Sequence, residues 1–338
     1  MKSNIKSLLY IFVGPVVLVY ICWFFYMIYT EGWGLFVHNF YMSLTMILGS
    51  MVAGASSEGG GAVAYPVMTL VFNIKPAVAR NFSLAIQSIG MTAASLWIIA
   101  RGIKIETTYL LYAMIGGTAG IIVSTFTIAP HVAPGYAKMM FVSFWLSFGI
   151  ALFFINHINK RDTYDSLDNL NNGQKIELLI IGFIGGTLSA IFGNGIDICT
   201  FAFVTLKYHL SEKVATPTSV VLMTSNAIVG TFLHFFILGD MQTQAINFWL
   251  VCIPICVIGA PMGAFIISKV NRISIAYLLY TLITVQFIAA LFIISPHGML
   301  LAASFITFVV GMVIFFVLTR IGKSGAEAKT ASSTSSSQ

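Results

Sequence analysis

The sequence predicts an all-α polytopic membrane protein built from two inverted repeats, and three observations predict it. Of the 338 residues, 58% are hydrophobic and only 8% are charged, whereas a soluble domain carries about 25% charged residues. Uncharged segments of about 20 residues, the length that a helix needs to cross a bilayer, recur along the chain. The stretches 49–89 and 182–228 share one pattern of apolar segment, small-residue break, short apolar segment and polar helix, which indicates an internal duplication.

The first uncharged run, at 8–29, follows Lys2 and Lys6. It is longer than the apolar core of a signal peptide, about 7–15 residues, so we interpret it as a retained transmembrane helix. Further uncharged or nearly uncharged segments follow at 35–55, 60–73, 79–100, 107–128, 136–156, 176–192, 196–207, 214–238, 245–267, 274–294 and 299–319. The segments 60–73 and 196–207 are too short to span and each follows a glycine-rich break, so we expect re-entrant or broken half-helices there.

These segments divide the chain into six parts, with a broken hairpin and three spanning helices in each repeat. The expected parts are an N-terminal transmembrane helix (1–34), repeat one (35–156), a cytoplasmic linker loop (157–175), repeat two (176–295), a C-terminal transmembrane helix (296–322) and a tail (323–338). The tail lacks apolar residues that could build a core, so its composition predicts disorder.

The distribution of Lys and Arg predicts the orientation of the repeats. If the N-terminus is cytoplasmic and each half-helix returns the chain to the side it came from, 14 of the 17 Lys and Arg residues are cytoplasmic, as the positive-inside rule requires. Only Lys75, Arg80 and Lys138 then lie outside, whereas a single crossing per hairpin would give 12 against 5. Repeat one therefore begins outside and repeat two inside, which is the inverted arrangement of many secondary transporters.

Both repeats are interrupted where a bilayer would be deepest, and an offset of 136 residues superposes Gly59 on Gly195 and Ser83 on Ser219. The first break contains Ser56, Ser57, Glu58, Gly59, Gly60 and Gly61, and the second contains Gly193, Asn194, Gly195 and Asp197. A half-helix that begins at a break points its unbonded N–H groups and positive dipole end into it. Two such ends predict a binding site for a small anion near the midplane, although small residues also serve close helix crossings alone.

Two carboxylates and one histidine in these segments are candidates for proton coupling. Glu58 and Asp197 lie within the breaks, and an ionisable group inside a membrane is a functional hypothesis by default. Either carboxylate can carry a coupling proton or coordinate a cation, and either can instead cap a helix N-terminus. His234 lies within an apolar helix, where it can relay protons or bridge helices.

The helices after the half-helices carry polar stripes. In the first, Asn81 and Ser88 share a face with Thr92 and Ser95, while Gln87 lies on a neighbouring face. In the second, the corresponding polar residues are Ser219, Ser225 and Asn226. Such side chains either donate hydrogen bonds to a substrate or bridge helices. Arg80, at the outer start of its helix, can either pair with an anionic substrate or extend to lipid phosphate.

With these motifs the chain resembles the sulfite exporter TauE/SafE family, also called the TSUP family of permeases. At 57–70 the chain reads SEGGGAVAYPVMTL, close to a GxGGG-then-Pro signature with Pro66 in the expected place. At 78–88 it reads VARNFSLAIQS, and at 214–222 VATPTSVVL repeats the start of that helix. The second break departs from the family pattern, because GNGIDI with Asp197 replaces a run of glycines.

The resemblance implies a permease, and not an enzyme, for sulfite, thiosulfate, an organosulfonate such as sulfoacetate, or a related small anion. It implies an exporter, which we expect to be proton-coupled, with no cofactor, no metal and no catalytic residue. We expect a bacterial inner-membrane protein with both termini cytoplasmic, no nucleic-acid partner and an oligomeric state that stays open. The alternatives are a cation or metal transporter that uses Glu58 and Asp197 as ligands, and an intramembrane enzyme, for which the chain lacks a GxSxG break or HExxH motif.

Overall fold

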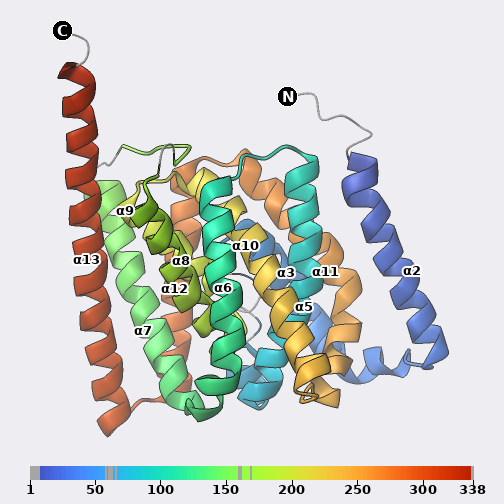
Figure 1. Ribbon diagram of the computed structural model, residues 1–338. Coiled ribbons are helices and arrows are strands. Elements are labelled where there is room, and N and C mark those ends of the chain that lie inside the picture. Colours follow the sequence, from blue (N-terminus) through green and yellow to red (C-terminus); the bar gives the residue numbers. More distant parts are fainter. Residues whose placement is uncertain are drawn as a thin grey trace.

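The computed structural model describes residues 8–57, 59, 64, 67–158, 162–167 and 170–335. Within these residues, ten helices are long and apolar enough to cross a membrane, and the described secondary structure is helical apart from one isolated bridge between Tyr164 and Leu210. The predicted all-α polytopic class is therefore confirmed (Figure 1).

The first repeat contains two long helices that flank the first break. Its helices are α3 (Gly34–Ala55), η2 (Val67–Val71), α5 (Pro76–Ala100), α6 (Thr107–Thr127), η3 (Ala129–His131), α7 (Pro134–Phe153) and η4 (Phe154–Ile158). Most of the predicted half-helix at 60–73 lies outside the described residues, and its described end is the π-helical turn η2. Pro76 begins α5, where the N–H that proline lacks would have no partner within the helix.

The second repeat also begins with a long helix that leads into its break. Its helices are α8 (Asn172–Phe192), α9 (Ile196–Lys207), α10 (Glu212–Phe232), η5 (Leu233–Ile237), α11 (Thr243–Lys269) and α12 (Arg272–Ile294). A capping box between Asn171 and Gln174 starts α8. The second predicted half-helix, 196–207, coincides with the 12-residue helix α9.

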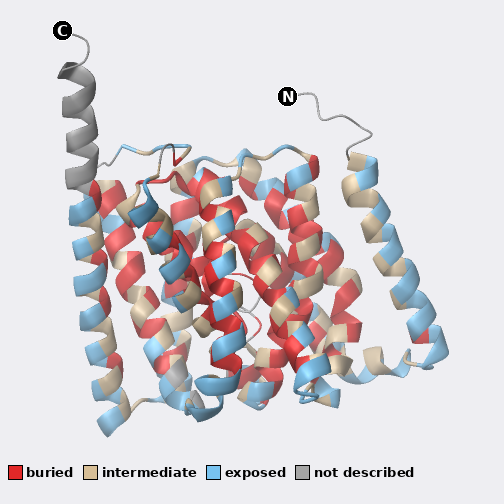
Figure 2. Ribbon diagram, viewed as in Figure 1, coloured by how far each residue is buried: buried red, intermediate tan, exposed pale blue. Residues whose placement is uncertain are grey.

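The remaining helices lie at the two edges of the bundle. η1 (Leu8–Val13) and α2 (Gly14–Tyr29) form one edge, and α13 (Gly298–Ser335) forms the other (Figure 1). α13 continues through 323–335, for which the composition predicts disorder, so the helix extends past the predicted limit at 322. Buried residues gather in the helices between these edges (Figure 2).

Helices of the two repeats pack in matched pairs. α3 packs on α11 as α8 packs on α6, and α5 packs on α11 as α10 packs on α6. A two-fold operation that exchanges the repeats would produce this pattern of contacts. The inverted relation of the repeats stays a prediction, which this pairing supports.

Glycines allow the closest of these contacts. A Cβ atom added to Gly116 of α6 would lie 1.9 Å from the carbonyl oxygen of Leu179 in α8. A Cβ atom on Gly54 of α3 would lie 1.8 Å from the carbonyl oxygen of Ala260 in α11. Backbones approach this closely in membrane proteins where small residues occupy the interface, so both helices that lead into the breaks are held against the opposite repeat.

Candidate functional site

The first break lies where the two repeats meet. α3 ends at Ala55, and Ser56 is extended with φ −133° and ψ 164°. Gly59 has φ +66°, a left-handed conformation that glycine adopts without steric cost. A Cβ atom on Gly59 would lie 2.6 Å from Gln87 Oε1 and 2.7 Å from Asp197 Oδ2. The first break is therefore in contact with α5 of its own repeat and with the start of α9 in the other.

The second break is held by the first repeat. Gly193 ends α8 in the left-handed region with φ +81°. Its carbonyl oxygen accepts hydrogen bonds from Gln87 Nε2 at 2.9 Å and from Ser83 Oγ at 3.3 Å. Gln87 Nε2 also donates to Ser83 Oγ at 2.8 Å. The amide of Gln87 thus bonds to the second break through its nitrogen and faces the first break through its oxygen.

Asp197 has one oxygen in a capping bond and one without a partner. Its Oδ1 accepts a hydrogen bond from the N–H of Gly195 at 3.1 Å, which is the capping geometry at the start of α9. Its Oδ2 is buried and bonds to no other described atom. The N–H of Ile196 is bonded separately, to Ser189 Oγ at 3.1 Å. The capping and coupling hypotheses for Asp197 therefore concern different oxygens of one carboxyl group.

Other buried polar atoms around the breaks also lack partners among the described residues. They are Ser57 Oγ, Gln87 Oε1 and both amide atoms of Asn226. Asn226 lies beside the second break, because a Cβ atom on Gly117 would lie 2.9 Å from Asn226 Nδ2 and 1.9 Å from Ile196 Cδ1. Buried polar groups are nearly always paired in folded proteins, so the unpartnered atoms at the breaks require an explanation.

The other predicted residues are placed as follows. Ser56, Asn194 and Ser219 are buried, and the hydroxyl groups of Ser56 and Ser219 donate to carbonyl oxygens of their own helices. Ser88 and Ser225 are half-buried and do the same, with Ala85 at 2.8 Å and Leu222 at 2.7 Å. Glu58, Gly60 and Gly61 lie outside the described residues. The residues that the structure brings together at the breaks are thus Ser57, Gly59, Gln87, Gly193, Gly195, Asp197 and Asn226. The hydroxyl groups of Ser88 and Ser225 form their hydrogen bonds within their own helices instead.

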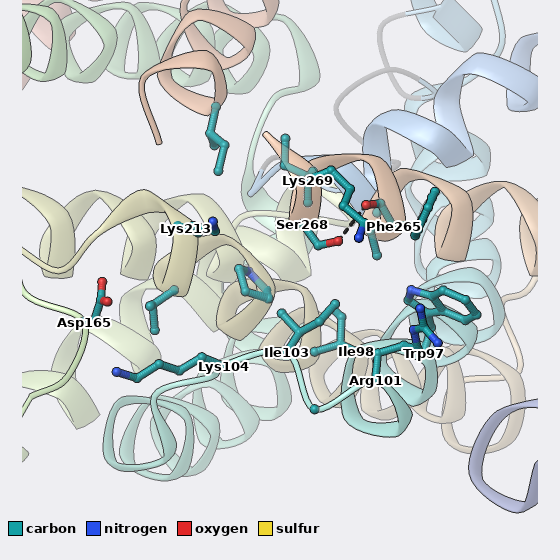
Figure 3. A pocket seen from close by; sticks show the side chains of 17 residues that line it. Trp97, Ile98, Arg101, Ile103, Lys104, Asp165, Lys213, Phe265, Ser268 and Lys269 are labelled. Carbon is teal, nitrogen blue, oxygen red and sulfur yellow. Dashed lines mark hydrogen bonds between the residues drawn. The ribbon is translucent and has the colours of Figure 1, made fainter. Parts of the chain in front are cut away.

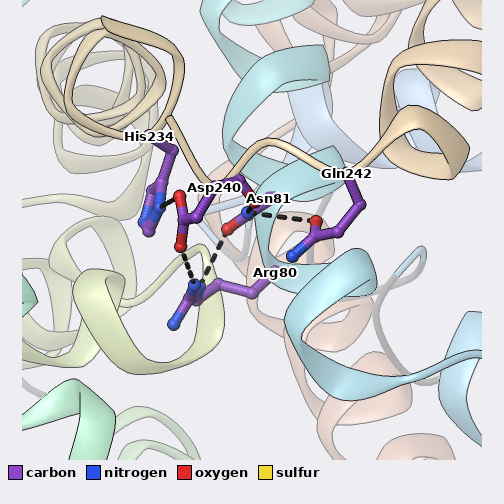
Figure 4. Close-up of polar contacts among 5 residues, drawn as sticks. All are labelled: Arg80, Asn81, His234, Asp240 and Gln242. Carbon is purple, nitrogen blue, oxygen red and sulfur yellow. Dashed lines mark hydrogen bonds and ion pairs between the residues drawn. The ribbon is translucent and has the colours of Figure 1, made fainter. Parts of the chain in front are cut away.

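Arg80, Asn81 and His234 belong to a separate polar cluster that joins the two repeats (Figure 4). Arg80 Nη2 lies 3.7 Å from Asp240 Oδ2, and His234 Nδ1 lies 2.7 Å from Asp240 Oδ1. Asn81 Nδ2 donates to the carbonyl oxygen of Asp240 at 3.2 Å and to Gln242 Oε1 at 3.1 Å. This cluster connects the start of α5 to the segment between η5 and α11.

A cavity of about 560 Å³ lies at the opposite end of the bundle (Figure 3). It is bounded by the C-terminal ends of α5 and α11 and by the start of α10. Gly54, two residues before the first break, forms part of its wall. The breaks therefore lie between the Arg80–Asp240 cluster at one end of the bundle and the cavity at the other.

The far end of α9 is anchored to α8. Lys207 Nζ and the Tyr208 hydroxyl each lie 2.6 Å from Glu177 Oε2. Burial and the neighbouring carboxylate raise the pKa of Tyr208, so this hydroxyl group stays protonated and donates its hydrogen bond. The short helix is therefore fixed at both ends.

Several residues at the breaks and in the cluster are absent from the predicted site. Ser189 accepts the hydrogen bond of the Ile196 N–H, and Asp240 and Gln242 bind Arg80 and Asn81. Ser189 lies one turn before the second break, a position that could have suggested a role in capping. No group of three or more His, Cys, Asp or Glu side chains that could hold a metal ion occurs in the described part of the chain.

The chain matches a known protein family. The protein-family model described as Sulfite exporter TauE/SafE matches residues 42–292, which include both breaks and both polar helices. No curated protein and no solved structure matches the chain.

Proposed function

Since this chain belongs to the sulfite exporter TauE/SafE family, it is a multi-pass membrane transporter and not an enzyme, and we propose that it exports a small sulfur-containing anion. Sulfite, thiosulfate and an organosulfonate such as sulfoacetate are the candidate substrates. The substrate binds between the two glycine breaks. We further propose that the protein is in a bacterial inner membrane with both termini in the cytoplasm, as the distribution of Lys and Arg predicts.

The observation that carries this proposal is the set of unpartnered polar atoms at the breaks. Ser57 Oγ and Asn226 Nδ2 are buried hydrogen-bond donors, one from each repeat, and neither bonds to another described atom. Leaving a buried donor unbonded costs about 1–3 kcal/mol. A sulfur oxyanion, whose oxygens are all acceptors, would satisfy such donors, and an anion also suits the positive dipole end of α9.

Proton coupling is proposed on the geometry of Asp197. Its Oδ2 and Gln87 Oε1 both face Gly59 and both lack a donor. When Asp197 is ionised, these two acceptors and an incoming anion repel one another. A proton on Oδ2 supplies a donor for Gln87 Oε1 and removes the charge, so protonation and binding of the anion favour each other.

A coupling cation is the second candidate, on the same two oxygens. Carboxylate and amide oxygens are the ligands that hard cations prefer, and Asp197 Oδ2 and Gln87 Oε1 face one position at Gly59. A cation bound there would neutralise Asp197 as a proton does. Transport driven by a cation gradient and indifferent to pH would favour this candidate.

Alternating access is proposed to exchange the two ends of the bundle. In this conformation the Arg80–Asp240 cluster joins the repeats at the end predicted to be extracellular, and the cavity lies at the end predicted to be cytoplasmic. A cavity beside Gln87 has a volume of only about 10 Å³, close to the minimum that one water molecule needs. Movement of the two repeats relative to each other would open the breaks to each end of the bundle in turn.

Binding of sulfite, thiosulfate and sulfoacetate to the purified protein, measured as a shift in melting temperature, tests this function. A ligand that binds only the folded state raises its stability by mass action. We expect a shift with at least one of these anions, lost in Asn226→Ala and retained in Ser225→Ala, whose hydroxyl group bonds within its own helix. A shift with sodium or potassium salts of any anion, equal for chloride and thiosulfate, would contradict the anion site.

A further inference from the structure

We propose that the 560 Å³ cavity is a second anion-binding site, a loading vestibule in which the substrate is captured before it reaches the breaks. The proposal rests on the proposed transport of a small anion, and it adds a site, a set of residues and the side of the membrane on which that site opens.

The cavity is strongly basic. Four of its lining residues are cationic, namely Arg101, Lys104, Lys213 and Lys269, and one, Asp165, is acidic. The four cationic residues come from three separate parts of the chain. Figure 3 shows Lys104, Lys213 and Lys269 around the cavity, with Arg101 beside Trp97. Cations gathered on a concave surface raise the local concentration of anions.

The three lysines of the cavity make no ion pair with any described residue. Lys104, Lys213 and Lys269 are exposed, and the ion pairs found among the described residues involve other side chains. By contrast, Lys207 at the same end of the bundle is paired with Glu177 at 2.6 Å. The lysines of the cavity are therefore available to an anion from solution, while Lys207 is occupied in fixing α9.

Buried apolar residues also form part of the wall. Ile98, Val214, Ala264 and Ile275 are buried and line the cavity. Gly54 also lines it, two residues before Ser56. The cavity wall therefore includes a residue of α3 only two positions before the first break, which contains the donor Ser57.

The local potential can be measured without knowing the substrate. In a Cys22→Ser background, which removes the exposed native cysteine and leaves the three buried ones, Ser268→Cys places a thiol in the cavity wall. The full-length protein in detergent is then treated with an anionic and a cationic methanethiosulfonate reagent. The ratio of the two reaction rates reports the charge around the thiol, with Thr127→Cys, exposed at the other end of the bundle, as reference.

We expect the anionic reagent to be favoured at position 268 relative to position 127. In water a unit charge about 7 Å away changes the rate for a monovalent reagent about threefold, so Lys213→Gln and Lys269→Gln should each lower the ratio of the two rates roughly sevenfold at low ionic strength. Lys175→Gln, at the same end but outside the cavity wall, should leave it unchanged. The same substitutions of Lys213 and Lys269 should raise KM for the anion with little effect on kcat. If Ser268→Cys fails to fold, Ile103→Cys gives the same reading.

The two proposals fail in different ways. The vestibule is overturned if the ratio of anionic to cationic reaction rates at position 268 equals that at position 127. It is also overturned if Lys213→Gln and Lys269→Gln leave that ratio unchanged, even when thiosulfate is still transported. A high ratio in a protein that neither binds nor transports any sulfur anion leaves the basic vestibule standing and overturns the proposed substrate instead.

Discussion

Gln87 is the residue that links the two breaks. Its amide nitrogen bonds to the Gly193 carbonyl oxygen at 2.9 Å, and its amide oxygen faces Gly59. One planar group therefore contacts two segments that are far apart in sequence. Asp197, which faces the same glycine, is the ionisable member of this group.

Gly59→Ala should impair the site by two independent effects. The left-handed backbone costs a residue with a Cβ atom about 1–2 kcal/mol, and the new methyl group would lie within 2.7 Å of both Gln87 Oε1 and Asp197 Oδ2. We expect a lower melting temperature and loss of transport. Gly34→Ala, where nothing lies within 4 Å of the added Cβ atom, serves as the control; equal behaviour of the two variants would contradict the geometry at the first break.

Asp197→Asn should separate proton coupling from binding. The amide keeps a capping oxygen for the Gly195 N–H and imitates the protonated acid, so we expect a folded protein that still binds the anion. Transport in proteoliposomes should lose its response to a pH gradient, whereas Asp162→Asn, an exposed carboxylate, should retain it. A pH response that survives in Asp197→Asn would assign coupling to another group.

At the scale of the elements, the helices that enter the breaks are positioned by backbone contact with the opposite repeat. A Cβ atom on Gly186 of α8 would lie 2.1 Å from the carbonyl oxygen of Gly117 in α6, and one on Gly263 of α11 would lie 2.0 Å from that of Met51 in α3. Such interfaces tolerate no added side chain. These backbone contacts fix the position of each break along the axis of the bundle.

Gly186→Val should therefore destabilise the whole bundle. Overpacking a tight interface costs about 1–3 kcal/mol, and here the contact is with backbone, which cannot rotate away. We expect a lower melting temperature and poor monodispersity in size-exclusion chromatography. Gly135→Val, where an added Cβ atom would have no neighbour within 4 Å, should behave as wild type. A monodisperse Gly186→Val protein of unchanged stability would show that the two helices can move apart to accommodate the side chain.

At the scale of the whole molecule, the Arg80–Asp240 cluster is the contact that must open if the repeats alternate. Ser83, buried one turn beyond Arg80, offers a position to detect this. In Ser83→Cys on the Cys22→Ser background, modification by a hydrophilic thiol reagent added from outside should be slow, and Asp240→Asn should accelerate it several-fold by removing the ion pair with Arg80. An unchanged rate would mean that this cluster does not close the outer path.

Hydropathy and repeat pattern were sufficient to predict the spanning helices, the two breaks and the helix α9, because each depends on local composition. The partners of Arg80 and Asn81 were not predictable, since Asp240 and Gln242 follow about 160 residues later. The polar pattern of the helix made Ser88 and Gln87 equal candidates for binding substrate, although the Ser88 hydroxyl group bonds within its own helix. The basic cavity joins lysines from distant segments, and only packing brings these together.

The most direct test of the central claim is flux of a labelled sulfur anion through proteoliposomes. We expect wild-type protein to move thiosulfate, sulfite or sulfoacetate, Gln87→Leu to lose at least tenfold in rate, and Ser88→Ala to match wild type. That pairing contrasts the residue that bonds to the second break with its neighbour that bonds only within its helix. Equal flux in all three proteins, or flux of a cation with none of the anions, would contradict a sulfur-anion site between the breaks.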